Sequence, residues 1–211
     1  MRQVVTEEDV RRAAKTTKII PVDRDTLITP AATDLAKEKG VLFEDSAIRS
    51  QVAKQAGSII DEFPVKKVAI ASDHGGFDLK TKLIPYIKEL GYTILDLGPQ
   101  NPNPCDYPDF AFQVASLVSE RKVQRGIMID SVGIGSAMAA NRVKGVLAAK
   151  CNNAFEARSA REHNYANVLT LGAKIIGEEI AKEIVKFFLQ TPGGTERHKK
   201  RVEKILSEES K

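Results

Sequence analysis

From Val65 onward, short apolar runs rich in Val, Ile, Leu and Ala alternate with longer stretches that have helical periodicity. This alternation is typical of βαβ units, which build a mostly parallel sheet with helices on its faces. Runs that are apolar throughout are expected for strands covered on both faces. Five such strands are predicted, at Lys67–Ala71, Thr93–Leu97, Gly126–Ile129, Val146–Lys150 and Val168–Leu171.

Between these strands, apolar residues recur at spacings of three and four, which predicts amphipathic helices. Gly91 and Gly177 mark helix boundaries, and Pro85 predicts a kink inside the first helix. The predicted helices cover Leu79–Leu90, Phe110–Ser119, Ile134–Asn141, Phe155–Glu162 and Glu178–Leu189.

A last helix is predicted from Thr195 to Glu209, with Thr195 as its N-cap. Its apolar residues Val202, Ile205 and Leu206 form a narrow stripe, and such a stripe usually packs on a neighbour. Because Gly193-Gly194 precedes this helix and frees it from the domain body, we expect it to reach across a dimer interface.

Residues 1–62 have a different pattern. A helix start with acidic residues at Thr6–Asp9 is followed by a short apolar run, Lys18–Val22. A second helix begins at Thr29-Pro30 and ends at Gly40. These elements predict a small α+β unit.

A further helical segment, 46–60, has mixed polarity and is expected to link this unit to the sheet. The predicted organisation is an N-terminal extension at residues 1–62 and a main domain at residues 63–211. The main domain is expected to be a Rossmann-like α/β domain, with a five-stranded, mostly parallel sheet in three α/β/α layers.

Composition agrees with this organisation, because 42% hydrophobic and 28% charged residues among 211 are typical of a soluble globular protein. No run of about 18 apolar residues occurs, so we expect a cytoplasmic protein without a membrane partner. The two cysteines, Cys105 and Cys151, are far apart, which argues against a disulfide framework or a structural metal site.

The formal charge of +4 suits anionic small substrates as well as nucleic acid. Only 6% of the residues are aromatic, Trp is absent, and no basic stripe is interleaved with Tyr or Phe. We therefore expect a small-molecule ligand and no nucleic-acid partner.

The first candidate for chemistry is Asp73-His74, at the end of the first predicted strand of the main domain. Parallel sheets present their ligand-binding loops at this edge, and the following Gly75-Gly76 allows the backbone to approach a substrate. The alternative is a helix cap beside a buried imidazole.

The second candidate is Asp130-Ser131-Val132-Gly133-Ile134-Gly135-Ser136, which follows the third strand and opens into a helix. Amides at a helix N-terminus can hold a phosphate or an oxyanion. The dinucleotide-binding motif is incomplete because its third glycine is replaced by Met138. Two roles are open for Asp130, a general base or an N-cap of the helix.

Two further groups lie near helix ends. His163 and Asn164 close a predicted helix, and a neutral imidazole there could act as acid or base on a sugar. Arg197, His198 and Arg201 fall in the first turns of the last helix, where the two guanidiniums share one face and could bind a phosphate. A solvated basic face is the alternative.

Five short motifs follow one another along the chain: Ser72-Asp73-His74-Gly75-Gly76, Asp106-Tyr107-Pro108, Gly133-x-Gly135 with Ala139-Ala140-Asn141, Glu162-His163-Asn164-x-x-Asn167, and Arg197-His198-x-x-Arg201-Val202. In this order they resemble the family of type B ribose-5-phosphate isomerases and galactose-6-phosphate isomerases, over about residues 66–207. The resemblance implies a Rossmann-like homodimer or tetramer whose active sites are shared between subunits, and it implies no metal and no organic cofactor.

The same resemblance implies how the residues divide the work on a sugar phosphate. His163 opens the furanose ring while Asp73 contacts the sugar oxygens, and Asp130 moves a proton between the first two carbons through a cis-enediolate. The substrate-binding positions implied are Tyr107, Ser131, Gly133, Gly135, Asn141 and Asn164, and the phosphate-binding positions are His74, Arg197, His198 and Arg201.

The chain departs from the best-known family members at the base. They carry Cys where this chain has Asp130 and often Thr where it has Val132, and a Glu that serves as base in others aligns with Ser136. A similar Asp occurs in one subunit type of the galactose-6-phosphate isomerases. The expected activity is interconversion of ribose 5-phosphate and ribulose 5-phosphate or a related pair, and the alternatives are galactose-6-phosphate isomerisation or a non-catalytic sugar-phosphate-binding or assembly subunit.

The N-terminal extension resembles a short module attached to enzymes of bacterial microcompartments. The resemblance rests on Val5-Thr6-Glu7-Glu8-Asp9-Val10-Arg11 and Ile28-Thr29-Pro30-Ala31-Ala32-x-Asp34-Leu35-Ala36. It implies docking to shell or cargo proteins and a location inside a microcompartment. The alternative is a lid or an oligomer contact.

Overall fold

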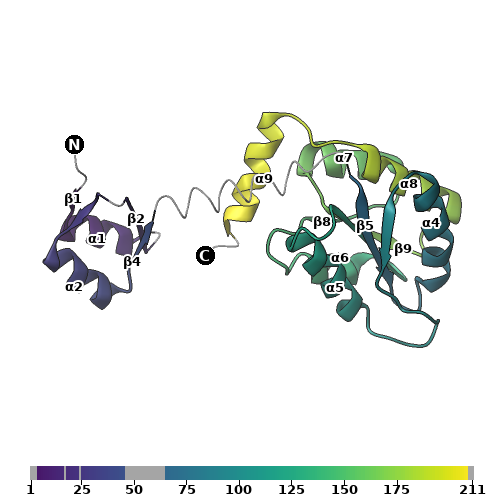
Figure 1. Cartoon of the computed structure of the whole chain (residues 1–211), viewed down its shortest axis with the longest axis horizontal. Helices are drawn as coiled ribbons and strands as arrows, with labels where there is room; N and C mark the ends of the chain where they lie inside the picture. The colour runs from purple at the N-terminus through teal and green to yellow at the C-terminus, as the bar shows by residue number, and fades with distance from the viewer. Residues whose placement is uncertain (1–3, 17, 24, 46–64, 209–211) are drawn as a thin grey trace. The chain divides into compact units, whose positions relative to one another are not determined.

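The computed structural model describes residues 4–16, 18–23, 25–45 and 65–208. The helix predicted at residues 46–60 lies outside them. The chain divides into two compact units, Met1–Ala56 and Gly57–Lys211. Figure 1 shows the smaller unit with its two helices and the larger unit around its sheet.

The N-terminal unit packs two helices against two short parallel strand pairs, β1 with β3 and β2 with β4. The first helix starts where predicted, because the Asp9 carboxylate accepts hydrogen bonds from the backbone N and the hydroxyl of Thr6, at 2.9 and 2.8 Å. Thr29 caps the second helix, and Gly40 ends it with a φ of 65°. The elements are β1 (Val4–Val5), α1 (Glu7–Ala14), β2 (Ile19–Val22), β3 (Leu27–Ile28), α2 (Pro30–Lys39) and β4 (Leu42–Asp45).

The larger unit is built on a five-stranded parallel sheet with the order β6-β5-β7-β9-β8. All five strands predicted from the apolar runs are present, with ends shifted by one or two residues. The strands are β5 (Lys67–Ser72), β6 (Thr93–Asp96), β7 (Arg125–Asp130), β8 (Ala148–Lys150) and β9 (Val168–Gly172). The strands all end on the same side of the sheet, which we call the carboxyl edge. The side on which they begin is called the amino edge.

Helices cover both faces of this sheet, which confirms the three-layer fold. Leu83 of α4, Ala157 of α7 and Phe188 of α8 share one apolar core with one face of the sheet. Val114 of α5 and Ala140 of α6 share a second core on the other face (Figure 1). The helices are α4 (Phe77–Glu89), α5 (Tyr107–Ser119), α6 (Ile134–Ala140), α7 (Ala154–Asn164), α8 (Glu178–Gln190) and α9 (Glu196–Glu208).

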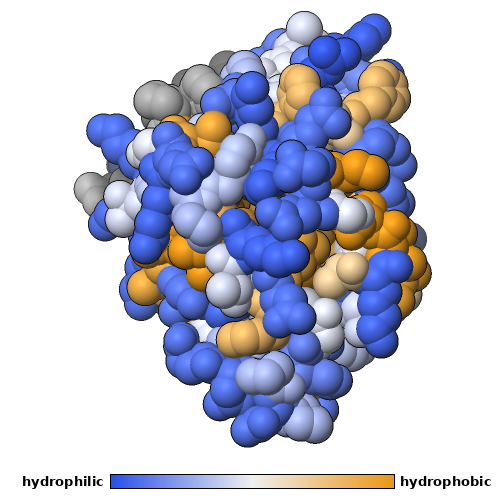
Figure 2. All heavy atoms as spheres, turned by 90° about the vertical axis from the view of Figure 1, so that its right-hand side faces the viewer, coloured by the Kyte–Doolittle hydropathy of each residue, from blue (hydrophilic) through white to orange (hydrophobic). Residues whose placement is uncertain are grey.

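The outer surface over α4 and α8 is mostly hydrophilic. Figure 2 views the molecule from this side and shows apolar side chains in small groups between hydrophilic ones. One ion pair joins the two helices, since Glu178 of α8 lies 3.1 Å from Lys82 of α4, and a second pair within α8 holds Glu178 2.8 Å from Lys182. Pro85 lies inside α4, which continues through it. Because exposed pairs of this kind contribute little to stability, the two cores carry most of it.

The glycine pair before the last helix does not free it from the domain body as we expected, while the crossing of a dimer interface by this helix stays a prediction. Gly193 and Gly194 are packed rather than free, because a Cβ on Gly193 would lie 2.0 Å from the Tyr165 ring. The Tyr165 hydroxyl also donates to the Gly194 carbonyl at 2.7 Å. Val202 of α9 is 1% exposed and packs against Tyr165. The start of α9 is thus held on its own chain, while Ile205 on the same helix remains exposed.

Candidate active site

Two buried carboxylates meet at the carboxyl edge because β5 and β7 are neighbours in the sheet. Ser72 lies opposite Ile129, and the Asp73 backbone N–H donates to the Ile129 carbonyl at 3.0 Å. Asp73 follows β5 directly and Asp130 is the last residue of β7, and their exposed fractions are 6% and 5%. The sheet register therefore places both predicted acids at one edge, where open α/β sheets bind ligands.

The Asp130 carboxylate is fully engaged by the loop that follows it. Its Oδ1 accepts from the backbone N–H groups of Val132, at 2.7 Å, and of Gly133. Its Oδ2 accepts from the Ser136 backbone N–H, at 3.2 Å, and from the Ser136 hydroxyl. Of the two roles that the sequence leaves open, these contacts fit a cap: the N-cap position itself is Gly133, and Asp130 before it accepts from the third residue of α6, Ser136.

This arrangement changes the prediction for the loop amides. The N–H groups of Val132 and Gly133, which we expected to hold a negative oxygen of the substrate, already donate to Asp130. Gly133 has a φ of 86°, a value that suits glycine and that turns its amide toward the carboxylate. The loop thus stabilises an anion, but this anion is a side chain of the protein itself.

Asp73 is engaged on one side only. Its Oδ1 accepts from the Gly76 backbone N–H at 2.9 Å, at the start of α4. Within the described part of the chain, no hydrogen bond is made by its second oxygen, Oδ2. A Cβ on Gly75 would lie 2.3 Å from the Ser131 Oγ and 3.3 Å from the Asp73 Oδ1, so Ser131 is close to the same carboxylate. Asp73 therefore keeps an oxygen that could contact a substrate or accept a proton.

His74 and Tyr107 are held at this edge by the segment between β6 and α5. The exposed His74 ring places its Nδ1 3.3 Å from the backbone N of Cys105 and 3.2 Å from the carbonyl oxygen of the same residue. Tyr107 begins α5 and packs on the glycine loop, because a Cβ on Gly135 would lie 2.6 Å from its ring. The structure thus brings together Asp73, His74, Tyr107, Asp130, Ser131, Gly133 and Gly135.

A second group of predicted residues lies where α7 ends and α9 begins. The rings of His163 and His198 have centroids 4.5 Å apart, and the His198 Nδ1 lies 3.0 Å from the Glu162 carbonyl oxygen. The guanidinium of Arg197 lies 3.3 Å from the His198 Nε2. Asn164 and Arg201 are exposed beside them. The imidazoles and guanidiniums of this cluster can donate hydrogen bonds to the oxygens of a phosphate or a sugar.

The two groups lie at opposite edges of the sheet. The helix that carries His163 leads into the first residue of β9, Val168, which pairs with Gly126. Asp130 lies four residues beyond Gly126 on β7, which corresponds to about 13 Å along the strand. A single chain therefore does not bring His163 to the carboxylates.

Asn141 belongs to neither group. Its side chain accepts from the backbone N of Ala148 and donates to the carbonyl of the same residue, both at 2.9 Å. It follows the last residue of α6, at the opposite end from the Asp130 loop. Its amide thus ties α6 to β8, and the structure does not place it with the substrate-binding residues as we predicted.

Two roles were not predicted from the sequence: Ser136 as the partner of the Asp130 carboxylate, and Cys105 as the contact of His74. A serine in the first turn of a predicted helix, after an aspartate, is a signal for mutual capping, and it could have identified Ser136. For Cys105, which acts through its backbone, the sequence contains no comparable signal. Burial, reinforced by the Glu156 carboxylate, raises the pKa of the Cys151 thiol to about 12, so Cys151 is no substitute for a cysteine base.

Among the described residues, no group of three His, Cys, Asp or Glu side chains is arranged to hold a metal ion. In the same part of the chain, none of the helices has the length and apolarity needed to cross a membrane.

Comparison with known proteins identifies the larger unit. A family model described as ribose/galactose isomerase matches residues 68–205. Ribose-5-phosphate isomerase B of Escherichia coli is 39% identical over 149 residues, which cover 70% of this chain and 99% of that protein. D-erythrulose-4-phosphate isomerase of Pectobacterium atrosepticum is 40% identical over 124 residues, covering 58% of this chain and 81% of that protein.

Solved structures agree with these relatives. The structure of ribose-5-phosphate isomerase B from Clostridium thermocellum superposes with a TM-score of 0.67 at 42% identity. It covers 68% of this chain and 97% of that structure. Residues before Val68 lie outside the family match.

The capping geometry predicts that two similar substitutions differ in their effect on stability. Asp130→Asn replaces one oxygen by an amide nitrogen, so a donor of the loop loses its acceptor, and we expect a loss of about 1–3 kcal/mol in the free energy of unfolding. Asp73→Asn keeps the single oxygen that accepts from Gly76 and should cost less than about 1 kcal/mol. Urea unfolding followed by circular dichroism measures both, and equal losses would contradict the assignment of Asp130 as the cap.

Proposed function

The chain belongs to the ribose/galactose isomerase family, and on this premise we propose that it interconverts the aldose and ketose forms of a sugar phosphate, with ribose 5-phosphate and ribulose 5-phosphate as the preferred pair. The observation that carries the proposal is the pair of buried carboxylates, Asp73 and Asp130, beside an exposed imidazole at the carboxyl edge. In the reaction a base removes the hydrogen on the second carbon, and the resulting enediolate takes a proton on the first carbon. The neighbouring carbonyl acidifies that hydrogen, so the proposed chemistry needs no cofactor.

We assign the proton transfer to Asp73 rather than to Asp130. A general base needs an oxygen that can reach the substrate and accept a proton, and Asp73 keeps such an oxygen in its Oδ2. Both oxygens of Asp130 are held by four donors, so its use as a base would require the loop to open. The role of Asp130 is then to fix the conformation of the loop that follows β7, on which the Tyr107 ring packs.

The remaining residues are supplied by a second copy of the chain. His163, Asn164, Arg197, His198 and Arg201 lie at the amino edge, about 13 Å of strand away from Asp130. In a homodimer, the amino edge of one copy can meet the carboxyl edge of the other. The partner then supplies the imidazole that opens the sugar ring and the guanidiniums that bind the phosphate.

Two other substrates remain candidates because the family includes them. The name of the Pectobacterium relative specifies a four-carbon sugar phosphate, and an aspartate at the position of Asp130 resembles the galactose-6-phosphate isomerases. A non-catalytic sugar-phosphate-binding subunit of the same fold would bind these compounds without exchanging the hydrogen on the second carbon. Deuterium uptake from D2O separates these cases when it is read by NMR at the second carbon of the aldoses ribose 5-phosphate and galactose 6-phosphate and at the first carbon of the ketose erythrulose 4-phosphate.

For the N-terminal unit, we propose docking to shell or cargo proteins of a bacterial microcompartment. Its own apolar core, which includes Val10, Ala32 and Leu35, supports an independent role. Exposed apolar side chains, Leu27 and Leu42 among them, offer a contact surface for a partner. The enzyme would then act inside such a compartment rather than free in the cytoplasm.

The assignment of the base predicts that Asp73→Asn lowers kcat by about a thousandfold, because proton abstraction loses its acceptor. The substitution keeps the oxygen that caps α4, so the fold and the KM should change little. A coupled isomerase assay and deuterium exchange at the second carbon measure the loss. Asp78→Asn, an exposed aspartate in the first turn of the same helix, is the matched control. Full activity in Asp73→Asn together with a dead but folded Asp130→Asn would return the role of base to Asp130.

The shared site predicts recovery of activity when two inactive variants are combined. Asp73→Asn disables the carboxyl edge and Arg201→Ala disables the amino edge, so a mixed dimer contains one intact site. Because half of the dimers in a random mixture are mixed, co-expression should restore about one quarter of the wild-type activity. The pair Arg197→Ala with Arg201→Ala, both at the amino edge, should restore none. Equal recovery in both mixtures would contradict the shared site.

The docking proposal predicts that deletion of residues 1–60 leaves isomerase activity within about twofold of the full chain, because a unit with its own core can be removed separately. The shortened protein should no longer co-purify with microcompartment shells. Both are measured on the same preparation, and fusion of residues 1–62 to a fluorescent protein tests whether the segment is sufficient. Loss of activity on deletion would instead support a lid over the active site.

A further inference from the structure

A lysine ammonium is buried beneath the carboxyl edge, outside the group of residues described above. Lys80 of α4 is 1% exposed, and its Nζ lies 2.7 Å from the Asp96 Oδ1 and 3.0 Å from the Pro99 carbonyl oxygen. Asp96 is the last residue of β6, and its side chain is 29% exposed. One charged group thus joins the helix, the end of a strand and the segment that follows it.

The same carboxylate oxygen also shapes the start of that segment. The Asp96 Oδ1 accepts from the Gly98 backbone N–H at 3.0 Å, and the Gly98 carbonyl accepts from the Ser72 backbone N–H at 3.0 Å. We call residues 97–106 the connecting segment. Its first residues are therefore fastened both to the ion pair and to the end of β5.

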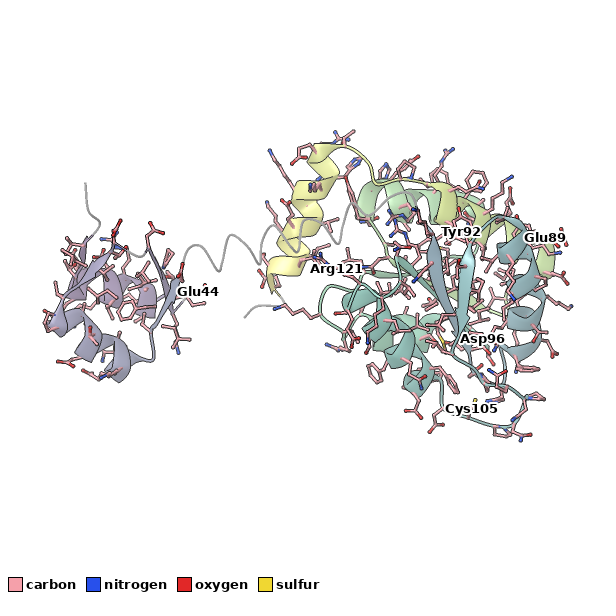
Figure 3. All side chains as sticks on the ribbon, in the orientation of Figure 1. Glu44, Glu89, Tyr92, Asp96, Cys105 and Arg121 are labelled. Atoms are coloured by element: carbon pink, nitrogen blue, oxygen red, sulfur yellow. The ribbon has the colours of Figure 1, made fainter. Side chains whose placement is uncertain are left out.

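The far end of the connecting segment holds two residues of the candidate site. The Cys105 peptide group contacts the Nδ1 of His74, and the segment leads directly into Tyr107, whose ring covers Gly135. Figure 3 shows Asp96 and Cys105 along this connection from β6. In a neutral imidazole with its proton on Nε2, Nδ1 accepts from the Cys105 N–H, while in an imidazolium it donates to the Cys105 carbonyl. The segment thus orients the ring in either state.

Stability alone does not account for a charge buried at this point. Taking an ammonium out of water is costly, and replacing a buried ion pair by apolar side chains of similar volume is often neutral or stabilising. What an apolar pair could not do is hold the Pro99 carbonyl and the Gly98 amide in fixed positions. The pair therefore acts through geometry.

We propose that Lys80 and Asp96 are positioning residues, which fix the connecting segment so that its backbone orients the His74 imidazole and delivers Tyr107 to the glycine loop. The part of this inference that concerns substrate rests on the proposed function. The part that concerns His74 does not, because it can be observed without substrate.

Imidazole nitrogen NMR of the full-length protein tests the inference, since the chain has three histidines. His74 lies at the carboxyl edge, while His163 and His198 lie at the amino edge and act as internal controls. In Lys80→Met and Asp96→Ala we expect the nitrogen resonances of His74 to move toward those of a histidine whose ring has no fixed hydrogen-bond partner. The resonances of His163 and His198 should stay unchanged. Lys82→Met, on the same helix but in a surface ion pair, should leave all three unchanged. Asp96→Asn keeps an acceptor oxygen and should retain the wild-type His74 signal.

In the isomerase assay, both disruptive variants should raise KM about tenfold and change kcat by less than about threefold, as expected when an interaction of equal strength in the ground state and the transition state is lost. If Lys80→Met does not fold, Asp96→Ala carries the test, since water can reach the gap that it leaves. Unchanged His74 resonances, or equal changes in all three histidines, would overturn the inference. A selective His74 change in a protein whose wild type has no isomerase activity would instead contradict the proposed function.

Discussion

The hydrogen-bonded register between β5 and β7 is the constraint on which the candidate site depends. Because Ser72 lies opposite Ile129, the residues that follow the two strands must share the same small space. A Cβ on Gly76 would lie 2.2 Å from the Ile129 carbonyl oxygen, so no larger residue fits there. The glycines after Asp73 are therefore required by contact with the end of β7 and with Ser131 in the loop after it, before any substrate is considered.

The two carboxylates at this edge are buried to the same degree, but they differ in how many of their oxygens are already hydrogen-bonded. The reason is the loop that follows each of them. The loop after Asp130 turns back through Gly133 and presents its amides to that carboxylate. The turn after Asp73 returns only the Gly76 amide. Burial alone does not identify a catalytic acid or base, because the number of donors that face each oxygen decides what the oxygen can still do.

The fold was largely predictable because its determinants are local. Apolar runs predicted all five strands, and Thr29, Gly40 and their neighbours marked the ends of a helix through their own backbone preferences. The site was less predictable, because hydrogen bonding decides between roles that one residue type can fill. Asn141 is of a residue type that often binds sugar hydroxyls, yet its side-chain amide is hydrogen-bonded to the backbone N–H and C=O of Ala148. The pair Gly193-Gly194 suggested that the last helix is free of the domain body, but Gly193 packs closely against the Tyr165 ring.

The separation of the two groups of polar residues follows from the topology of a parallel sheet and carries a consequence for assembly. A helix that follows one parallel strand must return to the opposite edge before the next strand begins, so the end of α7 and the end of β7 point to different edges. No side-chain rotation moves His163 past the length of a strand. In the homodimer that we propose, a two-fold axis would remove the conflict, because it would set the amino edge of one copy against the carboxyl edge of the other and would do so twice. One interface of this proposed dimer would complete two equivalent sites, because each copy would supply to the other the residues that a single chain cannot bring together.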